Sequence, residues 1–349
     1  MSEGRTGTAR GVPAHGARRR AWGWRALLAV LVFAIVPAAL SGFGRSYFWQ
    51  VANITMIFML LAASLHLVTG VAGLLSLGHA AFYGLGAYTA ALLVTRLGLG
   101  FEATLPASGL VSALVALLVA LPTMRLVSIY FAVATLAIGQ MIYLVLLNWT
   151  DVTKGPNGIT LTRGLSLFGV GLGGPLAAYY TVALTVSLSV LVLHRLTHSY
   201  YGNALRSLRE DDQCADAMGV NVVRLKIEAF AVSAFFAGIA GSLWAHTAGY
   251  ISPVDFRFTE SILVLAMVVV GGLGSLPGAL IGAVLLILLP ELLRGFGDIR
   301  GLLVGLVMFF SILLLPKGLF GEVSAVNFVR RQLDAAWRRG PRGEGIGWR

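Results

Sequence analysis

Lysine and histidine are the first side chains to test for chemistry, because they serve nucleotide hydrolysis and metal binding. A P-loop needs a lysine followed by Ser or Thr after a glycine-rich run. Here Gly, Ile and Gly follow the only three lysines, Lys154, Lys226 and Lys317. His66 and His246 lie in apolar runs without Cys, Asp or Glu at metal-ligand spacing. We therefore expect no catalytic site, metal or cofactor in this chain.

Ser76 and His79 lie in a segment that is too rich in glycine to remain a plain helix. Its glycines are Gly70, Gly73, Gly78, Gly84 and Gly86. We expect a break or re-entrant turn at membrane depth, where half-helix N-termini favour carboxylates and freed carbonyls favour ammonium groups. Such a break suits a zwitterionic amino acid, and we assign Ser76, His79, Gly73 and Gly78 to a substrate pathway. The alternative is that these glycines only allow close helix packing.

A second glycine-rich segment contains two further pathway candidates, Gly272 and Ser275. Residues 71–80 and 270–279 share six of ten residues at a constant offset of 199. This match indicates an internal repeat with two broken helices beside one pathway. A coincidence between two sequences rich in Gly and Leu is the alternative.

The connection 196–226 carries the features of a docking element. The chain has no row of intramembrane carboxylates for ion coupling, so uphill transport would need energy from another protein. From Ala204 the pattern predicts one short amphipathic helix, with Leu205, Leu208, Ala215 and Met218 broadly on one side and Gly219 as its stop. We expect this loop to dock on an energy-supplying partner protein through Ala204, Leu205, Leu208, Arg209, Glu210, Asp211, Ala215 and Gly219. A solvated loop helix is the alternative.

The elements that must position these residues are membrane helices. The chain is 57% hydrophobic and only 12% charged, against about 25% charged in soluble domains. A span needs roughly 20 apolar residues, and a β-barrel would show alternation that these runs lack. We predict an all-α, polytopic transmembrane helical bundle of about ten spans, some broken or re-entrant: 26–41, 50–69, 79–98, 107–124, 127–148, 176–194, 227–247, 259–271, 275–290 and 302–316.

Basic residues give this bundle an orientation. With ten spans, 19 of the 26 Lys and Arg residues fall on the side of both termini and of 196–226, which makes that side cytoplasmic. The bias explains the net charge of +11 without nucleic acid. We divide the chain into a basic cytoplasmic N-terminal tail 1–25, a transmembrane permease domain 26–320 and a basic cytoplasmic C-terminal tail 321–349. The alternative for the first span is a cleaved signal peptide.

Four segments resemble the LivM-type branched-chain amino acid ABC transporter permease family. The docking loop has the R-E-D-D core at 209–212 and the Gly-Val-Asn ending at 219–221, and departs from the family at Asn203, where arginine is usual. The other three are Gly70–Tyr88, Arg125–Leu136 and Val269–Gly282. The resemblance covers about residues 50–320.

The resemblance implies a permease subunit of an ABC importer for leucine, isoleucine and valine in the bacterial inner membrane. It implies a second related permease, two cytoplasmic ATPases that bind ATP and Mg²⁺, and an extracytoplasmic solute-binding protein. The loop 148–159 resembles the family's external loop and would contact the binding protein, or is an ordinary turn. Importers of urea, short amides or other amino acids remain alternatives, as does an ATP-independent channel or secondary transporter.

Overall fold

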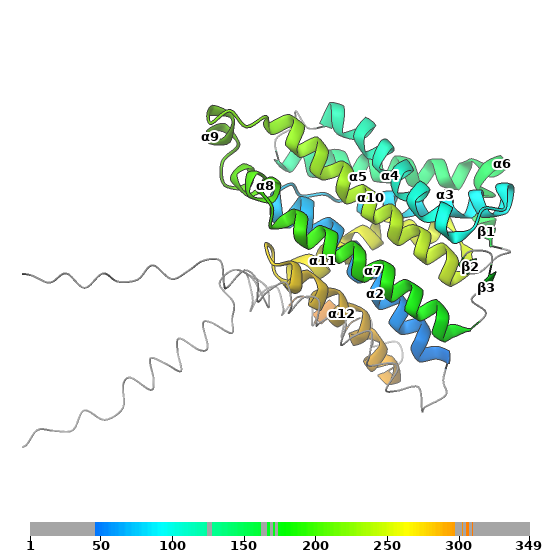
Figure 1. Ribbon diagram of the computed structural model, residues 1–349. Helices are drawn as coiled ribbons and strands as arrows, with labels where there is room; N and C mark the ends of the chain where they lie inside the picture. Colours follow the sequence, from blue (N-terminus) through cyan, green and yellow to red (C-terminus); the bar gives the residue numbers. More distant parts are fainter. Residues whose placement is uncertain are drawn as a thin grey trace, which may run out of the picture.

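The computed structural model describes residues 46–123, 128–161, 166–167, 170–171, 174–296 and the single positions 302, 305, 306 and 309. In this part of the chain, long helices lie side by side in one bundle (Figure 1). Its longer helices are α2 Ser46–His66, α3 His79–Leu97, α4 Phe101–Thr123, α5 Ser128–Asn148, α7 Pro175–Thr197, α10 Val222–Ala248, α11 Phe258–Gly271 and α12 Leu276–Leu292.

Shorter elements connect these helices. The π-helix η2 Leu67–Val71 continues α2, and α8 Tyr200–Glu210 and α9 Asp212–Ala217 join α7 to α10. The other connections contain α6 Thr150–Thr153, η3 Gly155–Asn157, η4 Pro253–Phe256, η5 Leu293–Phe296 and the strands β1 Ile159–Thr160, β2 Ser166–Leu167, β3 Val170–Gly171 and β4 Tyr250–Ile251.

Six of the described helices are long and apolar enough to cross a membrane: Tyr47–Val71, His79–Leu97, Phe101–Thr123, Ile129–Asn148, Pro175–Thr197 and Leu276–Gly295. The predicted span 227–247 coincides with α10 and 259–271 with the 14-residue α11. The predicted span 26–41 lies outside the described residues, as does 302–316 apart from four single helical positions. The count of about ten spans therefore stays a prediction.

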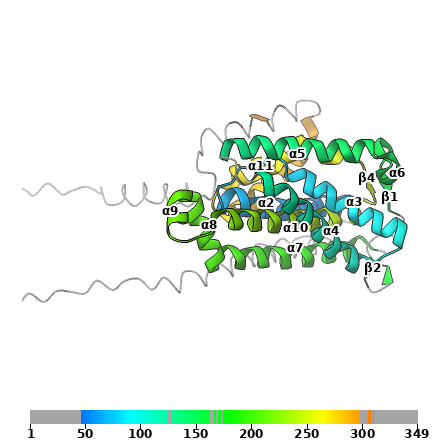
Figure 2. The ribbon, with the colours of Figure 1, turned by 90° about the horizontal axis from the view of Figure 1, so that it is seen from above.

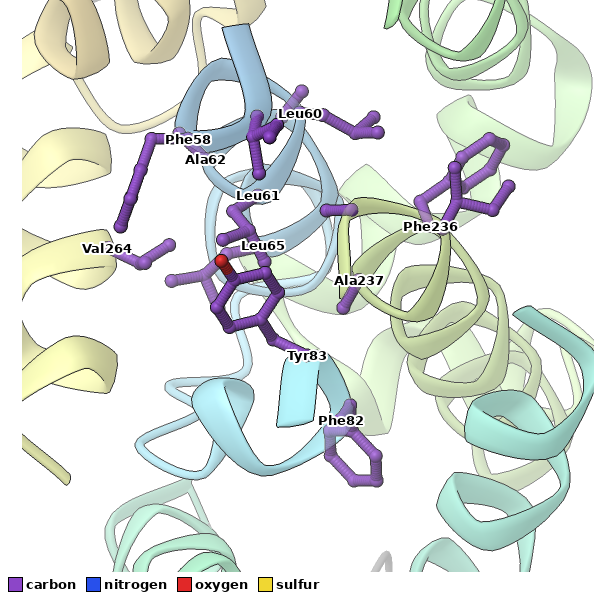
Figure 3. Packing of buried hydrophobic residues seen from close by; sticks show 14 of the residues in the cluster. Phe58, Leu60, Leu61, Ala62, Leu65, Phe82, Tyr83, Phe236, Ala237 and Val264 are labelled. Atoms are coloured by element: carbon purple, nitrogen blue, oxygen red, sulfur yellow. The ribbon is translucent and has the colours of Figure 1, made fainter. Parts of the chain in front are cut away.

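Helix α2 lies at the centre of the bundle. Its membrane window is 89% buried, against 22% for α5 at the periphery. Figure 3 shows Leu61 and Leu65 of α2 between Val264 of α11 and Ala237 of α10, with Tyr83 of α3 below them. Burial of a helix on all sides explains why apolar residues in α2 show no amphipathic period.

Helix α10 crosses α3 and α4 at positions where side chains are small. A Cβ added to Gly238 would lie 2.8 Å from Cβ of Ser112 in α4. A Cβ added to Gly241 would lie 2.6 Å from the backbone nitrogen of Ala87 in α3. Glycine at these crossings lets the helix backbones approach closely, as membrane helices require without a hydrophobic driving force between them.

The bundle has two distinct ends in both ribbon views, which we call the α8 end and the β1 end (Figure 2). At the β1 end, β1 pairs antiparallel with β4, so that Ile159 faces Ile251 and Thr160 faces Tyr250. The hydroxyl of Tyr250 also donates a hydrogen bond to the carbonyl of Asn157 at 3.2 Å. The connection after α5 is thereby attached to the end of α10.

Candidate functional site

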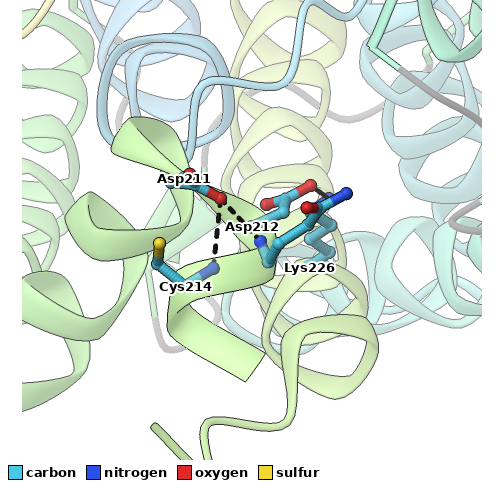
Figure 4. Close-up of polar contacts among 5 residues, drawn as sticks. Asp211, Asp212, Cys214 and Lys226 are labelled. Carbon is cyan, nitrogen blue, oxygen red and sulfur yellow. Dashed lines mark hydrogen bonds and ion pairs between the residues drawn. The ribbon is translucent and has the colours of Figure 1, made fainter. Parts of the chain in front are cut away.

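The docking segment at the α8 end contains two helices, so the prediction of one helix running from Ala204 to Gly219 is wrong. Asp211 interrupts it with φ −160° and ψ 114°. Its Oδ1 accepts hydrogen bonds from the backbone nitrogens of Gln213 at 2.8 Å and Cys214 at 3.1 Å (Figure 4). An aspartate in this position caps the N-terminus of the next helix, and the competing bonds end α8 at Glu210.

The cap also changes the acidity of both partners. Hydrogen bonds, first from the backbone of Cys214 and then from its side chain and the backbone of Gln213, lower the pKa of Asp211 below its ordinary 3.8. The carboxylate in turn raises the pKa of the Cys214 thiol above 9.0, chiefly through their hydrogen bond. A carboxylate that accepts amide donors is stabilised in its charged form, and that charge disfavours a neighbouring thiolate.

Burial in the docking segment follows the predicted apolar side except at its end. Leu205, Leu208 and Ala215 are buried, whereas Met218 is 84% exposed because the interruption at Asp211 shifts the register of α9. The predicted stop at Gly219 is confirmed, with φ +84° and a bond from the nitrogen of Val220 to the carbonyl of Ala215. This pattern is a Schellman end.

An ion pair attaches the docking segment to the bundle. Nζ of Lys226, in the first turns of α10, bonds Oδ2 of Asp212 in α9, and the lysine side chain is only 10% exposed (Figure 4). Sequence analysis missed this pair, because no helical spacing relates two residues on different helices. Beside it a pocket of about 540 Å³ opens between α9 and the start of α10, lined by Asp212, Gln213, Asp216, Gly219, Val220, Asn221, Val222 and Val223.

The predicted break after α2 is present. Residues 72–78 leave the helix between η2 and α3, and Gly73 has φ +74°. Ser76 is buried, and its Oγ has no hydrogen-bond partner among the described residues. His79 begins α3 and places Nε2 2.8 Å from Oγ of Ser64 in α2.

Helix α5 packs against this break at Gly78. A Cβ added to Gly139 would lie 2.9 Å from Cα of Gly78, and the nitrogen of Leu77 donates to Oγ1 of Thr135 at 3.1 Å. Gly78 is therefore needed for close packing, whatever else it does. Thr135 was not singled out from the sequence, since a lone threonine in an apolar helix carries no signal of its own.

A second break separates α11 from α12. Gly272 has φ +122° and Gly274 φ +93°, both outside the region that side chains favour. Ser275 caps α12, with its Oγ accepting from the nitrogen of Gly278 at 3.2 Å. Gly73 and Gly272, which correspond at the offset of 199, both have a positive φ just after a helix: Gly73 follows the C-cap of η2, and Gly272 is the C-cap of α11.

Helix α3, which follows the first break, and helix α11, which precedes the second, also contact each other. The nitrogen of Ala80, in the first turn of α3, donates to Oγ of Ser261, in the first turn of α11, at 2.9 Å. The N-termini of two helices therefore lie side by side. Positive helix ends at one place favour a negatively charged group. In the part of the chain that the structure describes, no hydrogen bond joins Ser76 or His79 to Ser275.

Arg209 is exposed as a residue, but its side chain reaches from α8 to the end of η2. Its Nη1 donates to the carbonyl of Gly70 at 2.7 Å, 139 residues away in the chain. A Cβ on Gly73 would lie 2.9 Å from Cγ of Arg209, and one on Gly274 would lie 3.0 Å from Nη1. The structure thus brings a predicted coupling residue together with both predicted breaks.

Comparison with known proteins agrees with this architecture. The family model described as branched-chain amino acid transport system, permease component, matches residues 47–313. The chain belongs to the branched-chain amino acid permease family. Membership fits an all-α, multi-pass membrane bundle, and the matched range contains both breaks and the docking segment.

Curated relatives carry related names. The high-affinity branched-chain amino acid transport system permease protein LivM of Salmonella typhimurium is 38% identical over 316 residues, which cover 84% of this permease and 74% of the relative. LivM of Escherichia coli K12 is 37% identical over the same shares, and LivH of that strain 29% identical over 250 residues, covering 66% and 79%. No solved structure matches the chain.

Proposed function

We propose that this permease is the transmembrane subunit of an ABC importer that moves leucine, isoleucine and valine across the bacterial inner membrane. The observation that carries the proposal is its 38% identity, over 84% of its length, to a relative named as a high-affinity branched-chain amino acid permease. The subunit pairs with a second related permease, two cytoplasmic ATPases and an extracytoplasmic solute-binding protein. The bundle has about ten spans and both termini in the cytoplasm.

Energy enters at the α8 end in this proposal. The chain lacks a P-loop, so ATP and Mg²⁺ are bound by the ATPases. Glu210 is exposed at the end of α8, and the pocket beside α9 offers a partner a surface with both polar and apolar side chains. The ion pair of Lys226 with Asp212 and the cap at Asp211 hold this surface in shape. Nucleotide-driven movement of the ATPases then changes the exposure of the pathway.

Substrate passes beside the two breaks. Ser76 has a hydroxyl without a hydrogen-bond partner among the described residues, and the positive φ of Gly73 and Gly272 turns the backbone away from helical geometry. His79, Gly78 and Ser275 act differently, since each already bonds or packs within the protein and so shapes the pathway. Amide and carbonyl groups at such breaks suit the carboxylate and ammonium of an amino acid.

The test is purification of the tagged permease with its partners, followed by reconstitution and uptake of labelled leucine. Glu210→Arg should reduce recovery of the ATPases, because it reverses an exposed charge at the docking surface. Asp151→Arg, an exposed acid at the β1 end, is the matched control and should recover them fully. Uptake should require ATP and the binding protein.

Two results would redirect the proposal. Uptake of labelled urea or a short amide, with leucine ineffective as a competitor, would assign another solute to the same importer. Solute movement by the permease alone in liposomes, without ATP, would replace the importer by a channel or secondary transporter.

A further inference from the structure

The end of α2 has an unusual hydrogen-bond pattern that leaves a carbonyl available. In η2 the nitrogen of Ala72 bonds the carbonyl of Leu67, and the nitrogen of Leu74 bonds that of Val68. The carbonyl of Gly70 instead accepts from Nη1 of Arg209 at 2.7 Å. Because carbonyls at a helix C-terminus carry partial negative charge, a guanidinium there stabilises the helix end.

The backbone at both breaks is shaped around this one side chain. Gly73 lies so close to Arg209 that a Cβ there would come within 3.2 Å of the arginine Cα, and Gly274 lies against the guanidinium. Gly73 belongs to the first break and Gly274 to the second. A single residue of α8 therefore contacts both segments at which the chain leaves its helices.

We propose that Arg209 is the positioning residue that transmits movement of the docking segment to the two breaks. This inference rests on the proposed function, because it takes α8 as the element that the ATPases move. With the guanidinium in place, the carbonyl of Gly70 is bonded and the turn at Gly73 is held. When α8 moves away, the carbonyl loses its donor and both breaks lose their common contact. The two breaks then rearrange together, since one side chain supports both.

Arg206 provides a matched control on the same helix. It lies one turn before Arg209, but its Nη1 bonds Oδ1 of Asn203, within α8 itself, at 3.0 Å. Arg206→Gln and Arg209→Gln remove the same charge from the same helix. Only the second removes the hydrogen bond to Gly70, at the end of η2 just before the first break.

The experiment uses the reconstituted complex and measures leucine uptake and ATP hydrolysis in the same sample. Arg209→Gln should still recover the ATPases and hydrolyse ATP, while leucine moved per ATP falls about tenfold, corresponding to ~1.4 kcal/mol. Arg206→Gln should stay within about twofold of wild type, because the hydrogen bond that it removes lies within α8. Arg209→Lys keeps the charge but not the planar fork, and should recover part of the ratio.

Hydrogen exchange of the purified permease gives a readout that does not depend on transport. Amides in 67–78 should exchange faster in Arg209→Gln than in wild type or Arg206→Gln. If Arg209→Gln does not accumulate, Arg209→Lys supports the same comparison.

The outcomes separate the inference from the function on which it rests. An unchanged ratio of uptake to hydrolysis overturns the link, as does unchanged exchange in 67–78. Loss of the ATPases with Arg209→Gln alone makes Arg209 a docking contact. If the wild-type complex shows no ATP-dependent leucine uptake, the proposed function fails even where exchange behaves as expected.

Discussion

Nε2 of His79 and Oγ of Ser64 lie 2.8 Å apart and join the two sides of the first break. Ser64 donates its only hydroxyl proton to the carbonyl of Leu61 at 2.8 Å, so the imidazole must donate from Nε2. The carbonyl of Ser64 accepts from Oγ of Ser233 in α10 at 2.6 Å. Helices α2, α3 and α10 are thus connected by polar contacts in a region that is otherwise apolar.

His79→Ala should therefore destabilise the permease without removing any exposed group. Without the imidazole donor, the buried Oγ of Ser64 loses a hydrogen bond, and the free energy of unfolding falls by about 1–3 kcal/mol. The measurement is the thermal unfolding midpoint in detergent, with Ser64→Ala as the partner variant and His79→Gln as a replacement that retains a donor. Equal midpoints for His79→Ala and wild type would mean that this bond contributes nothing to stability.

Gly238→Val should prevent folding at the crossing of α10 with α4. The new side chain would meet Cβ of Ser112 at 2.8 Å or less, and two packed backbones cannot move apart cheaply. Gly174→Ala is the control, because a Cβ there meets none of the described residues within 4 Å. Accumulation of monodisperse protein on size-exclusion chromatography reports the difference, and normal yields of Gly238→Val would contradict this packing.

Lys226→Ala should loosen the docking segment more than Arg224→Ala does. The Lys226 side chain is 10% exposed in its pair with Asp212, whereas the Arg224 side chain is 77% exposed in its pair with Glu228. An exposed i,i+4 pair contributes roughly 0.3–0.5 kcal/mol, and a less exposed pair is screened less by solvent. Hydrogen exchange in 211–218 measures the effect, and equal protection in the two variants would show that burial of the pair has no importance.

The thiol of Cys214 should react slowly at neutral pH and faster in Asp211→Asn. The carboxylate raises the pKa of this thiol, so little thiolate is present until the pH exceeds 9.0. Because Cys214 is the only cysteine, the rate of alkylation against pH reports this site alone. A pH profile that does not move toward lower pH in Asp211→Asn would contradict the assigned bond.

The cap at Asp211 has its own pH dependence. Its folded pKa lies below its ordinary value, so the stabilisation is present at neutral pH and is lost as the pH falls below 3.8 through the folded pKa. Asp211→Ala should destabilise helix α9 at neutral pH and have a smaller effect once the wild-type carboxylate is protonated. Exchange of the amides of Gln213 and Cys214 at pH 7 and pH 3 provides the measurement.

Apolar runs predicted where the helices lie, because length and hydropathy alone decide that a segment is buried in lipid or protein. The glycine-rich segments around Gly73 and Gly272 likewise predicted the breaks. Both residues have a positive φ, which glycine adopts more readily than other residues. The sequence contains a signal for the end of α8, because aspartate is a strong N-cap residue. The apolar pattern continues across Asp211, however, and favours a single helix.

Contacts between distant parts of the chain could not be predicted. The partner of Arg209 is 139 residues away, and the charge pattern around it equally suits a surface contact. The same holds for Lys226 with Asp212 and for the packing of α5 on Gly78. Such contacts depend on how helices are placed, which local spacing does not determine.

The pairing of Ile159 with Ile251 limits how the β1 end can open. It fastens the connection after α5 to the end of α10, with a further backbone bond from Leu161 to Gly249 at 2.8 Å. Helices α5 and α10 are therefore linked at this end, and we expect their ends to move together. In the importer that we propose, any opening at this end would have to carry the strand pair along with both helices or break its hydrogen bonds.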